Sequence, residues 1–439
     1  MHTTIPGEQR ITAGGADGRP IRQETTVNLF FAVILAALVV EYALHLAADL
    51  FNLKALKLEP PPDLEGVYRP EDYRSSQEYT RAKTRLHIGA ATFKLALLLA
   101  FWFAGGFNQL DGLVRGWGFI PVVSGLLYIG ILLLAYSLLT LPFSIYGTFV
   151  IEERFGFNRT TPRIFLLDRL KALGLATLLG APLLVGILTL FERAGAYAWL
   201  YCWAAVSLFS LGLQFVAPTW IMPLFNKFTP MESGELRDAI LGYARSVDFP
   251  VKNVFVMDGS KRSSRANAFF TGFGRNKRIA LFDTLIAKHS VREMVAVLGH
   301  EIGHYKKRHI IQMTVISILS TGLIFFLLSI FLASPGMYQA FFMERQPLYA
   351  GLLFFGLLYT PLELVLSALT HMLSRKNEYE ADRFAAGTID EPQTLVDALK
   401  KLSAGNLSNL TPHPFYVFLN YSHPPLLQRV QAIRRGAVE

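Results

Sequence analysis

The chain has 439 residues, of which 52% are hydrophobic and only 17% are charged, and its mean hydropathy is +0.35. Apolar runs of about 20 residues recur along it, and each is long enough to cross a bilayer as a helix. These properties exclude an ordinary soluble enzyme and predict an all-α polytopic membrane protein. The single cysteine, Cys202, excludes an intrachain disulfide framework.

The net charge of +9 and the pI of about 9.5 would suit a protein that binds nucleic acid. In a membrane protein, however, Lys and Arg collect on the cytoplasmic side for topological reasons. We therefore expect the lipid bilayer as a partner and no nucleic acid.

A polar N-terminal segment, residues 1–26, precedes the first apolar run. The hydropathy pattern then predicts seven membrane-spanning helices, five of them within residues 27–217 and two within residues 310–372. The expected spans are 27–51, 87–106, 119–141, 173–191, 197–217, 310–333 and 349–372. The fourth is the least regular, because Gly180 and Pro182 interrupt it.

Five ionisable residues fall inside the expected spans: Glu41, His45, Asp49, Lys94 and Glu363. Ionisable groups at membrane depth normally face a protein interior or a water-filled cavity. Together they predict a wet chamber among the helices. The alternative is that the expected boundaries misplace residues of the membrane surface, and this reading suits Asp49 best.

Basic residues are distributed unequally between the loops. The segments after spans one, three, five and seven hold 7, 5, 15 and 8 Lys and Arg residues, whereas the loops after spans two, four and six hold one each. By the positive-inside rule, the basic segments are cytoplasmic. The N-terminus is then outside, and the C-terminus is cytoplasmic together with two soluble pieces, residues 218–309 and 373–439.

The first soluble piece contains two expected strands, 253–258 and 278–282, with another apolar stretch at 267–272 between them. Residues 291–309 have helical periodicity and no proline, so a helix leads from this piece into span six. The second piece is predicted to be helical to about residue 402 and then to form a tail that contains Pro and Asn.

The sequence His300-Glu301-Ile302-Gly303-His304 is an H-E-x-x-H motif inside that expected helix. Positions i and i+4 share one face of a helix, so both imidazoles can bind one Zn²⁺ ion. Glu301 lies beside them, where it can act as a general base. The short motif also arises by chance, and two histidines near a membrane surface without a metal are the alternative.

A catalytic zinc ion needs a third protein ligand and one open position. Glu378 and Asp382 are spaced i, i+4 on an expected helix, so one can ligate the metal while the other holds a ligating histidine. The hairpin of the last two spans returns Glu378 to the membrane surface where His304 lies. Glu380 points to a different face of its helix and is the weaker ligand candidate.

Two further features suit peptide hydrolysis. Residues 266–272 could form a strand edge that holds a substrate backbone extended, although an ordinary packed strand explains them equally well. His423 lies in a proline-rich turn and could donate to a developing oxyanion. The alternative is a turn histidine without a catalytic role.

Six segments together resemble the type 1 CAAX prenyl proteases, which are integral-membrane zinc peptidases. The segments are FVIEERFGFNRT (149–160), PTWIMPLFNKF (218–228), NAFFTG (267–272), HEIGH (300–304), SRKNEYEAD (374–382) and SHPPLLQR (422–429). They occur in the order of the family over residues 27–436. Joint occurrence over nearly the whole chain makes the resemblance specific.

The resemblance implies a seven-helix barrel around a water-filled chamber, capped by a zincin-type α+β metalloprotease domain built from residues 218–309 and 373–439. It implies one Zn²⁺ ion per chain and a peptide or protein substrate that is isoprenylated at its C-terminal CAAX motif. The site residues it implies are His300, His304 and Glu378 as zinc ligands, Glu301 as general base, Asp382 as partner of a ligand, His423 in a catalytic role, and Asn267, Ala268, Phe269 and Arg429 in substrate binding.

The segment between the last two spans, residues 334–348, is short for the family, and no C-terminal endoplasmic-reticulum retention signal is present. Both features suggest a prokaryotic member in the cytoplasmic (inner) membrane, which leaves the natural substrate open. One alternative function is a quality-control zinc peptidase that cuts damaged membrane proteins without prenyl specificity. Another, from a different class, is a channel or transporter with a structural zinc.

Overall fold

The computed structural model describes residues 28–436 except 58, 61–63, 65, 252 and 272–277. The expected polar segment 1–26 and the last residue of the NAFFTG stretch therefore lie outside the described residues. Within the described part, seven helices are long and apolar enough to cross a bilayer, which confirms the number and order of the expected spans.

Several membrane helices are longer than the hydropathy pattern predicts, whereas the α-helical parts of the fifth and sixth are slightly shorter. They are α1 (Leu29–Lys54), α2 (Pro70–Phe103), α4 (Pro121–Tyr146) with the π-helical turn η2 (Gly147–Glu152), α5 (Pro162–Arg193), α6 (Ala198–Val216), α10 (His309–Phe331) and α12 (Leu348–Ala386). Hydropathy identifies the apolar part of a helix that lies in the hydrocarbon core. The helix itself can extend beyond that part into the aqueous phase. Pro182 lies inside α5 without ending it, because neighbouring groups can satisfy the backbone that a proline frees.

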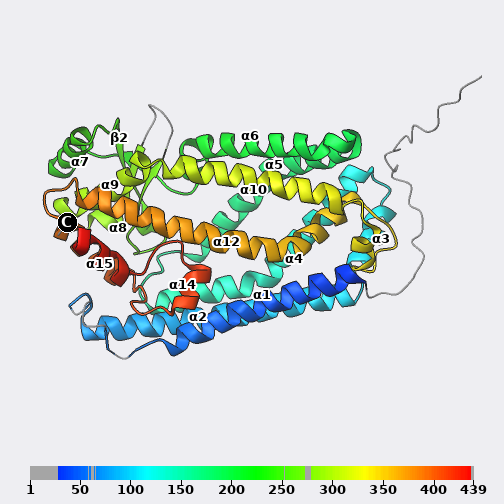
Figure 1. Cartoon of the computed structure of the whole chain (residues 1–439), viewed down its shortest axis with the longest axis horizontal. Coiled ribbons are helices and arrows are strands. Elements are labelled where there is room, and N and C mark those ends of the chain that lie inside the picture. Colours follow the sequence, from blue (N-terminus) through cyan, green and yellow to red (C-terminus); the bar gives the residue numbers. More distant parts are fainter. Residues whose placement is uncertain are drawn as a thin grey trace, which may run out of the picture.

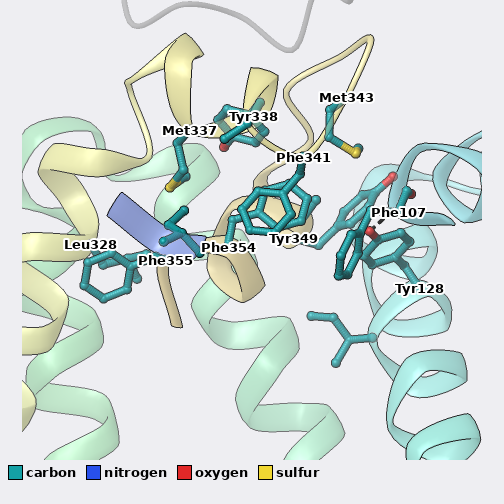
Figure 2. Packing of buried hydrophobic residues seen from close by; sticks show 14 of the residues in the cluster. Phe107, Tyr128, Leu328, Met337, Tyr338, Phe341, Met343, Tyr349, Phe354 and Phe355 are labelled. Carbon is teal, nitrogen blue, oxygen red and sulfur yellow. Dashed lines mark hydrogen bonds between the residues drawn. The ribbon is translucent and has the colours of Figure 1, made fainter. Parts of the chain in front are cut away.

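Figure 1 shows α1 and α2 along one side of the molecule and α6 and α10 along the other, with α12 between them. One end of the bundle is closed by α3 (Gly106–Gly116) and α11 (Pro335–Gln339). An aromatic cluster fills that end: Phe341 stacks on Phe354 at 3.9 Å and on Trp102 at 4.6 Å (Figure 2). The cluster ties α2 to α12 at the end of the bundle opposite to the soluble domain.

A four-stranded sheet forms the centre of the soluble domain, in the order β1 (Phe228–Pro230), β2 (Asn253–Met257), β4 (Arg278–Phe282), β3 (Ala268–Thr271). The strands β2 and β4 are parallel and match the two expected strands, whereas β3 pairs antiparallel with β4. β3 therefore lies at one edge of the sheet, as one reading of residues 266–272 predicts. Among the described residues, β4 alone pairs with it.

Helices from both soluble pieces complete this domain, and α8 and α9 contact the sheet directly. The helices are α7 (Glu235–Ser246), α8 (Asp283–Ile286), α9 (Val291–Lys306), α13 (Pro392–Gly405), α14 (Pro414–Asn420) and α15 (Leu426–Gly436). Short turns are η4 (Ala217–Ile221), η5 (Met222–Leu224) and η6 (Gly259–Lys261), while η3 (Gly195–Tyr197) joins the membrane helices α5 and α6. Ala296 of α9 shares a buried cluster with Ala385 of α12 and Val430 of α15. The two pieces thus share one core.

The helix α9 begins at a complete capping box. The Ser290 side chain accepts from the Glu293 backbone N–H, and the Glu293 carboxylate accepts from the Ser290 N–H. The helix ends at Lys306 rather than at the expected residue 309, because Arg308 adopts the left-handed conformation with φ of 60°. This break turns the chain directly into α10.

Two ion pairs fasten the segment before β3 to the membrane helices. Arg262 donates to both oxygens of Asp168 on α5, at 2.7 and 2.9 Å. Arg265 pairs with Glu152 of η2 at 3.0 Å and lies over the ring of Phe157. The position of the edge strand is therefore set by the membrane helices as well as by the sheet.

Candidate metal centre

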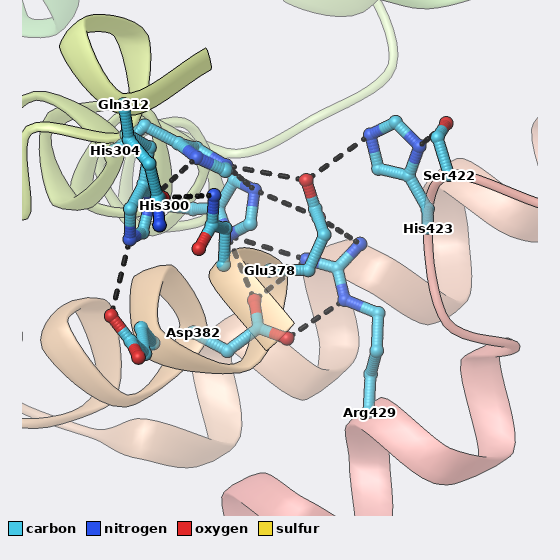
Figure 3. Close-up of polar contacts among 11 residues, drawn as sticks. His300, His304, Gln312, Glu378, Asp382, Ser422, His423 and Arg429 are labelled. Atoms are coloured by element: carbon cyan, nitrogen blue, oxygen red, sulfur yellow. Dashed lines mark hydrogen bonds and ion pairs between the residues drawn. The ribbon is translucent and has the colours of Figure 1, made fainter. Parts of the chain in front are cut away.

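The two histidines of the H-E-x-x-H motif lie one turn apart on α9 and direct their Nε2 atoms at a carboxylate of α12 (Figure 3). His300 Nε2 lies 3.4 Å from Glu378 Oε2, and His304 Nε2 lies 3.3 Å from Glu378 Oε1. The two imidazole nitrogens are 3.2 Å apart. The hairpin of α10 and α12 thus brings together three ligand atoms within 4.8 Å of one another.

These spacings match a tetrahedral metal site. Bonds of about 2.0–2.1 Å at a tetrahedral centre place neighbouring ligand atoms roughly 3.3 Å apart. Glu378 is 3% exposed, and its Oε2 atom accepts no hydrogen bond from any described residue, although Arg429 Nη1 forms a longer ion pair with it at 3.6 Å. A buried carboxylate oxygen without a donor is costly unless a cation compensates it. The residues present therefore fit a metal ion.

Gly303 lets α9 and α12 approach closely enough to form this site. A β-carbon built at Gly303 would lie 2.9 Å from both the Cα and the carbonyl oxygen of Ala381. One turn earlier, a β-carbon at Gly299 would lie 3.3 Å from the Cβ of Ala385. Two small residues on each helix, spaced i, i+4, therefore form the contact that carries Glu378 to the histidines.

Asp382 and Arg429 fix the orientation of the first histidine. Asp382 Oδ1 lies 2.8 Å from His300 Nδ1, so the opposite ring nitrogen faces Glu378. Arg429 of α15 donates to both Asp382 oxygens, at 2.8 and 2.6 Å. Burial by itself would lower the pKa of His300, but the hydrogen bond to Asp382 and the neighbouring carboxylate of Glu378 raise it to about 9. A raised pKa means that the site favours positive charge. Because a histidine ligand must be neutral, binding of a metal ion there releases protons.

The second histidine has a partner that the sequence analysis missed. His304 Nδ1 lies 3.1 Å from Nδ1 of His309, which is 4% exposed, and His309 Nε2 lies 3.2 Å from Glu380 Oε2. On one continuous helix, positions i and i+5 would lie about 140° apart. The backbone break at Arg308 brings them together, so no helical spacing rule reveals the contact.

Glu301 lies beside the ligand group and lines the same cavity as His304. Burial raises the pKa of the Glu301 carboxyl, and the nearby Glu378 adds to the effect, while His300 and His304 oppose it. A carboxylate with a raised pKa is a better proton acceptor at neutral pH than an exposed one.

His423 reaches the site from the turn before α15. Its Nε2 atom lies 3.2 Å from Glu378 Oε1, and its Nδ1 atom lies 2.9 Å from the Ser422 hydroxyl. The side chain is 63% exposed, and Figure 3 shows its ring directed at Glu378. The structure thus brings His423 and Arg429 to the ligand group, as the resemblance implies.

The expected substrate residues lie on the edge strand, which packs against α9. Ala268 and Phe269 belong to β3, and Asn267 directly precedes it. The backbone N–H of Ala268 donates to Asn267 Oδ1 at 2.9 Å, and the Asn267 carbonyl accepts from Phe282 N–H at 3.2 Å. The strand therefore lies next to the ligand helix but contributes no atom to the ligand group.

Two family models match nearly the whole chain. The model described as CAAX prenyl protease N-terminal, five membrane helices, matches residues 49–227, and the model of peptidase family M48 matches residues 230–437. The crystal structure of Ste24p from S. mikatae superposes with a TM-score of 0.87 at 34% identity, over 93% of this chain and 99% of that one.

Named relatives give the same result. CAAX prenyl protease 1 of Saccharomyces cerevisiae is 36% identical over 85% of this chain and 88% of its own length. The Arabidopsis thaliana homolog is 36% identical over 92% and 97%, and the Homo sapiens homolog is 33% identical over 85% and 88%. The chain therefore belongs to peptidase family M48, within the type 1 CAAX prenyl proteases, and is an integral-membrane zinc metalloendopeptidase.

Proposed function

We propose that this protein cleaves near the C-terminus of isoprenylated CAAX proteins, with one Zn²⁺ ion held by His300, His304 and Glu378. The observation that carries the metal assignment is that His300 Nε2 and His304 Nε2 lie 3.2 Å apart and 3.4 and 3.3 Å from the two oxygens of one buried carboxylate, Glu378. Two imidazoles and one carboxylate form a donor set that suits zinc. The substrate class follows from relatives of similar length that carry the name CAAX prenyl protease 1.

The chemistry assigned to the metal is that of a Lewis acid, which polarises the scissile carbonyl and acidifies a water molecule. Glu301 accepts the proton of the attacking water and returns it to the nitrogen of the leaving amine, as the C–N bond breaks. Its raised pKa favours both transfers near neutral pH. His423, exposed beside the ligand group, donates to the oxyanion that develops on the carbonyl.

Arg429 is assigned a positioning role beside this machinery. Its guanidinium is committed to Asp382 by two hydrogen bonds, and its side chain is only 12% exposed. These contacts favour a role in holding Asp382, and through it His300, over the direct substrate contact that the resemblance implies. Asn267, Ala268 and Phe269 keep the role of the substrate-binding edge, since β3 is the open edge of the sheet next to α9.

His309 and Glu380 are assigned the corresponding role for His304. Coordination through Nε2 of His304 requires a proton on its Nδ1, and that proton needs an acceptor. His309 accepts it at Nδ1 if its own proton lies on Nε2, which faces Glu380 at 3.2 Å. The chain His304–His309–Glu380 thus matches the pair His300–Asp382 on the other side of the ligand group.

The soluble domain is assigned to the cytoplasmic side, with the N-terminus outside, on the basis of the basic loops. Residues 218–309 and 373–439 are assigned to one metalloprotease domain, divided by the last two membrane helices, because their side chains share buried clusters. The relatives named above are eukaryotic, so the prokaryotic inner membrane stays a prediction from the sequence.

The test compares matched farnesylated and unfarnesylated C-a-a-X peptides with purified protein in lipid nanodiscs. We expect cleavage of the farnesylated peptide after the cysteine, lost on treatment with a chelator, restored by Zn²⁺ and absent in Glu301→Gln. Equal cleavage of both peptides would move the substrate class to unmodified membrane proteins, as for a quality-control peptidase. Undiminished cleavage by Glu301→Gln would refute the mechanism.

A further inference from the structure

The strand β3 has one edge that β4 covers and one edge that faces away from the sheet, which we call the free edge. The Phe282 N–H donates to the Asn267 carbonyl at 3.2 Å, so the backbone groups of Asn267 face β4. In an antiparallel pair, successive residues alternate between bonding to the partner strand and pointing away from it. The N–H and C=O groups of Ala268 and Phe270 therefore point to the free edge.

The same alternation continues in the segment before β3. The Thr284 hydroxyl, at the start of the helix that follows β4, donates to the Arg265 carbonyl at 2.7 Å. Arg265 thus faces the same side as Asn267. Ala266 lies between these two residues, so its backbone groups point to the free edge together with those of Ala268.

The side chain of Asn406 occupies the free edge at Ala266. Asn406 Oδ1 accepts from the Ala266 N–H, and Asn406 Nδ2 donates to the Ala266 carbonyl, both at 3.2 Å. A neighbouring strand would make the same two bonds with the C=O and N–H of one of its residues. The amide of Asn406 therefore takes the place of one residue of a neighbouring strand.

The chain before Ala266 is covered as well, by the loop that follows η2. The Ser264 N–H donates to the Phe157 carbonyl, and the Arg159 N–H donates to the Arg262 carbonyl, both at 3.0 Å. An extended peptide therefore finds no open backbone groups on this side of Ala266.

The open part of the free edge begins at Ala268. Its N–H donates to Asn267 Oδ1 at 2.9 Å, a contact within the same segment that another acceptor can replace. Within the part of the chain that the structure describes, no strand other than β4 pairs with β3. Unpaired strand edges are the usual places where an extended peptide adds to a sheet.

Contacts on both sides hold Asn406 in place. It caps the C-terminus of α13. The Tyr68 hydroxyl lies 2.8 Å from the Ser403 carbonyl oxygen and 2.9 Å from that of Ser408, so it ties the two ends of the turn together. The next residue, Leu407, packs against a buried cluster at the end of η2. Asn406 therefore keeps its position on the free edge independently of its contact with Ala266.

We propose that Asn406 is a positioning residue that ends the substrate-binding edge at Ala266 and so fixes the register of an extended substrate peptide on β3. A substrate strand can bond to Ala268 and to the residues after it, but it cannot pass Asn406. Because β3 contacts α9, which carries both histidine ligands, the register determines which peptide bond lies at the metal. The proposal deepens the proposed function and rests on its assignment of β3 as the substrate-binding edge.

A simpler role for Asn406 is to satisfy the backbone of Ala266, and this role makes a different prediction. Ala266 is 3% exposed, so its N–H and C=O need hydrogen-bond partners. Removal of an amide with only this role would change the stability and leave the position of the cut unchanged. Removal of a register stop would change the position of the cut.

Asn406→Ala uncovers the backbone groups of Ala266 and leaves the Ser264 N–H bonded to Phe157. A substrate strand can then shift along β3 by two residues, because a slip of one residue would turn its side chains to the other face. We expect one product from the native protein with a farnesylated C-a-a-X peptide. In Asn406→Ala, mass spectrometry should detect a second product, cut two residues away and amounting to about one tenth of the total or more.

Asn406→Ser should give the same second product, because a serine hydroxyl is too short to reach both backbone groups. Asn409→Ala is the matched control, since Asn409 belongs to the same turn but its amide donates to Asn52 of α1 at 3.3 Å. This control should give a single product. An unchanged single product from Asn406→Ala and Asn406→Ser, whatever the change in kcat/KM, would overturn the proposal, as would a second product from Asn409→Ala.

A scan with N-methylated substrate peptides needs no variant. N-methylation removes a donor, so it should lower kcat/KM of the native protein by about 10-fold at alternate residues along β3 and have no effect beyond Asn406. An alternating effect that continues along the whole peptide would mean that no stop exists. The same peptides without farnesyl keep the two questions apart. If the native protein cleaves them equally well, the prenyl specificity fails, while the second product of Asn406→Ala still decides the register.

Discussion

Gly303 lies directly against the backbone of Ala381, so that a β-carbon at Gly303 would come within 2.9 Å of the Ala381 Cα and carbonyl oxygen. This contact sets the distance between the helix that carries both histidines and the helix that carries Glu378. The ligand spacing near 3.3 Å therefore depends on a residue that binds no metal itself.

Gly303→Ala should separate α9 from α12, because backbone atoms of Ala381 cannot rotate away. We expect a loss of about 1–3 kcal/mol in stability from overpacking, together with weaker zinc binding in competition with a chromophoric chelator. Gly299→Ala is the matched control, since its nearest neighbour is the Tyr243 hydroxyl at 2.7 Å, the end of a side chain that can move. Equal zinc affinity of Gly303→Ala and Gly299→Ala would contradict the claim that the Gly303–Ala381 contact sets the ligand spacing.

Glu301→Gln removes the proton acceptor and keeps the shape of the side chain. We expect kcat to fall by about 10²–10⁴-fold, the usual contribution of a general base. Zinc content, measured by atomic absorption on the purified variant, should stay at that of the native protein, because Glu301 is not one of the three ligands. Loss of zinc in this variant would mean that the ligand set is assigned incorrectly.

His309→Phe removes the acceptor for the His304 Nδ1 proton without opening a cavity. Partners of this kind contribute roughly 10–100-fold to metal affinity, and we expect a loss of that size. His309→Gln should restore much of it, because an amide can accept from His304 and donate to Glu380. The d–d spectrum of the Co²⁺-loaded protein reports the geometry directly. Identical affinities for the Phe and Gln variants would show that His309 only fills space.

The capping box of α9 predicts a pH dependence of stability. Burial by itself would raise the pKa of Glu293, but the hydrogen bonds from the Ser290 N–H and from Lys401 lower it overall. A lowered pKa means that Glu293 stabilises the fold above its unfolded pKa of about 4.3 and that this contribution disappears as the pH falls through the folded value.

Thermal unfolding of Glu293→Gln and of the native protein, followed between pH 4 and pH 7, tests this. The difference in Tm should be largest at pH 7 and shrink towards pH 4. A difference that is constant over this range would exclude the ionised carboxylate as its cause. Ser290→Ala, which removes the other half of the capping box, should cost about 1 kcal/mol at every pH.

Much of the architecture follows from the sequence, because bilayer thickness demands long apolar runs and the H-E-x-x-H spacing demands a helix. The seven spans, the strands β2 and β4 and the ligand group His300, His304 and Glu378 appear where those rules place them. The hydropathy rule fails at helix ends, since water satisfies the exposed groups of a continuing helix. The start of α2 is therefore misplaced by 17 residues, at 87 instead of Pro70.

Sequence rules miss contacts that depend on an unusual backbone conformation. His309 meets His304 because Arg308 has a positive φ, and a non-glycine residue gives no local signal for that conformation. Glu380 lies on a different helix face from Glu378, and that difference gives no hint of its contact with His309.

One unbroken helix, α12, both crosses the membrane and carries Glu378. Glu378 lies 30 residues from Leu348, which corresponds to a lever of about 45 Å. A change in tilt of about 2° at the far end would displace the carboxylate by roughly 1.6 Å, several times the tolerance of about 0.5 Å that a catalytic constellation allows. Membrane helices tilt to match the hydrocarbon thickness. The thickness of the host bilayer therefore affects the position of Glu378 and with it the activity, so lipid chain length must be controlled in every assay.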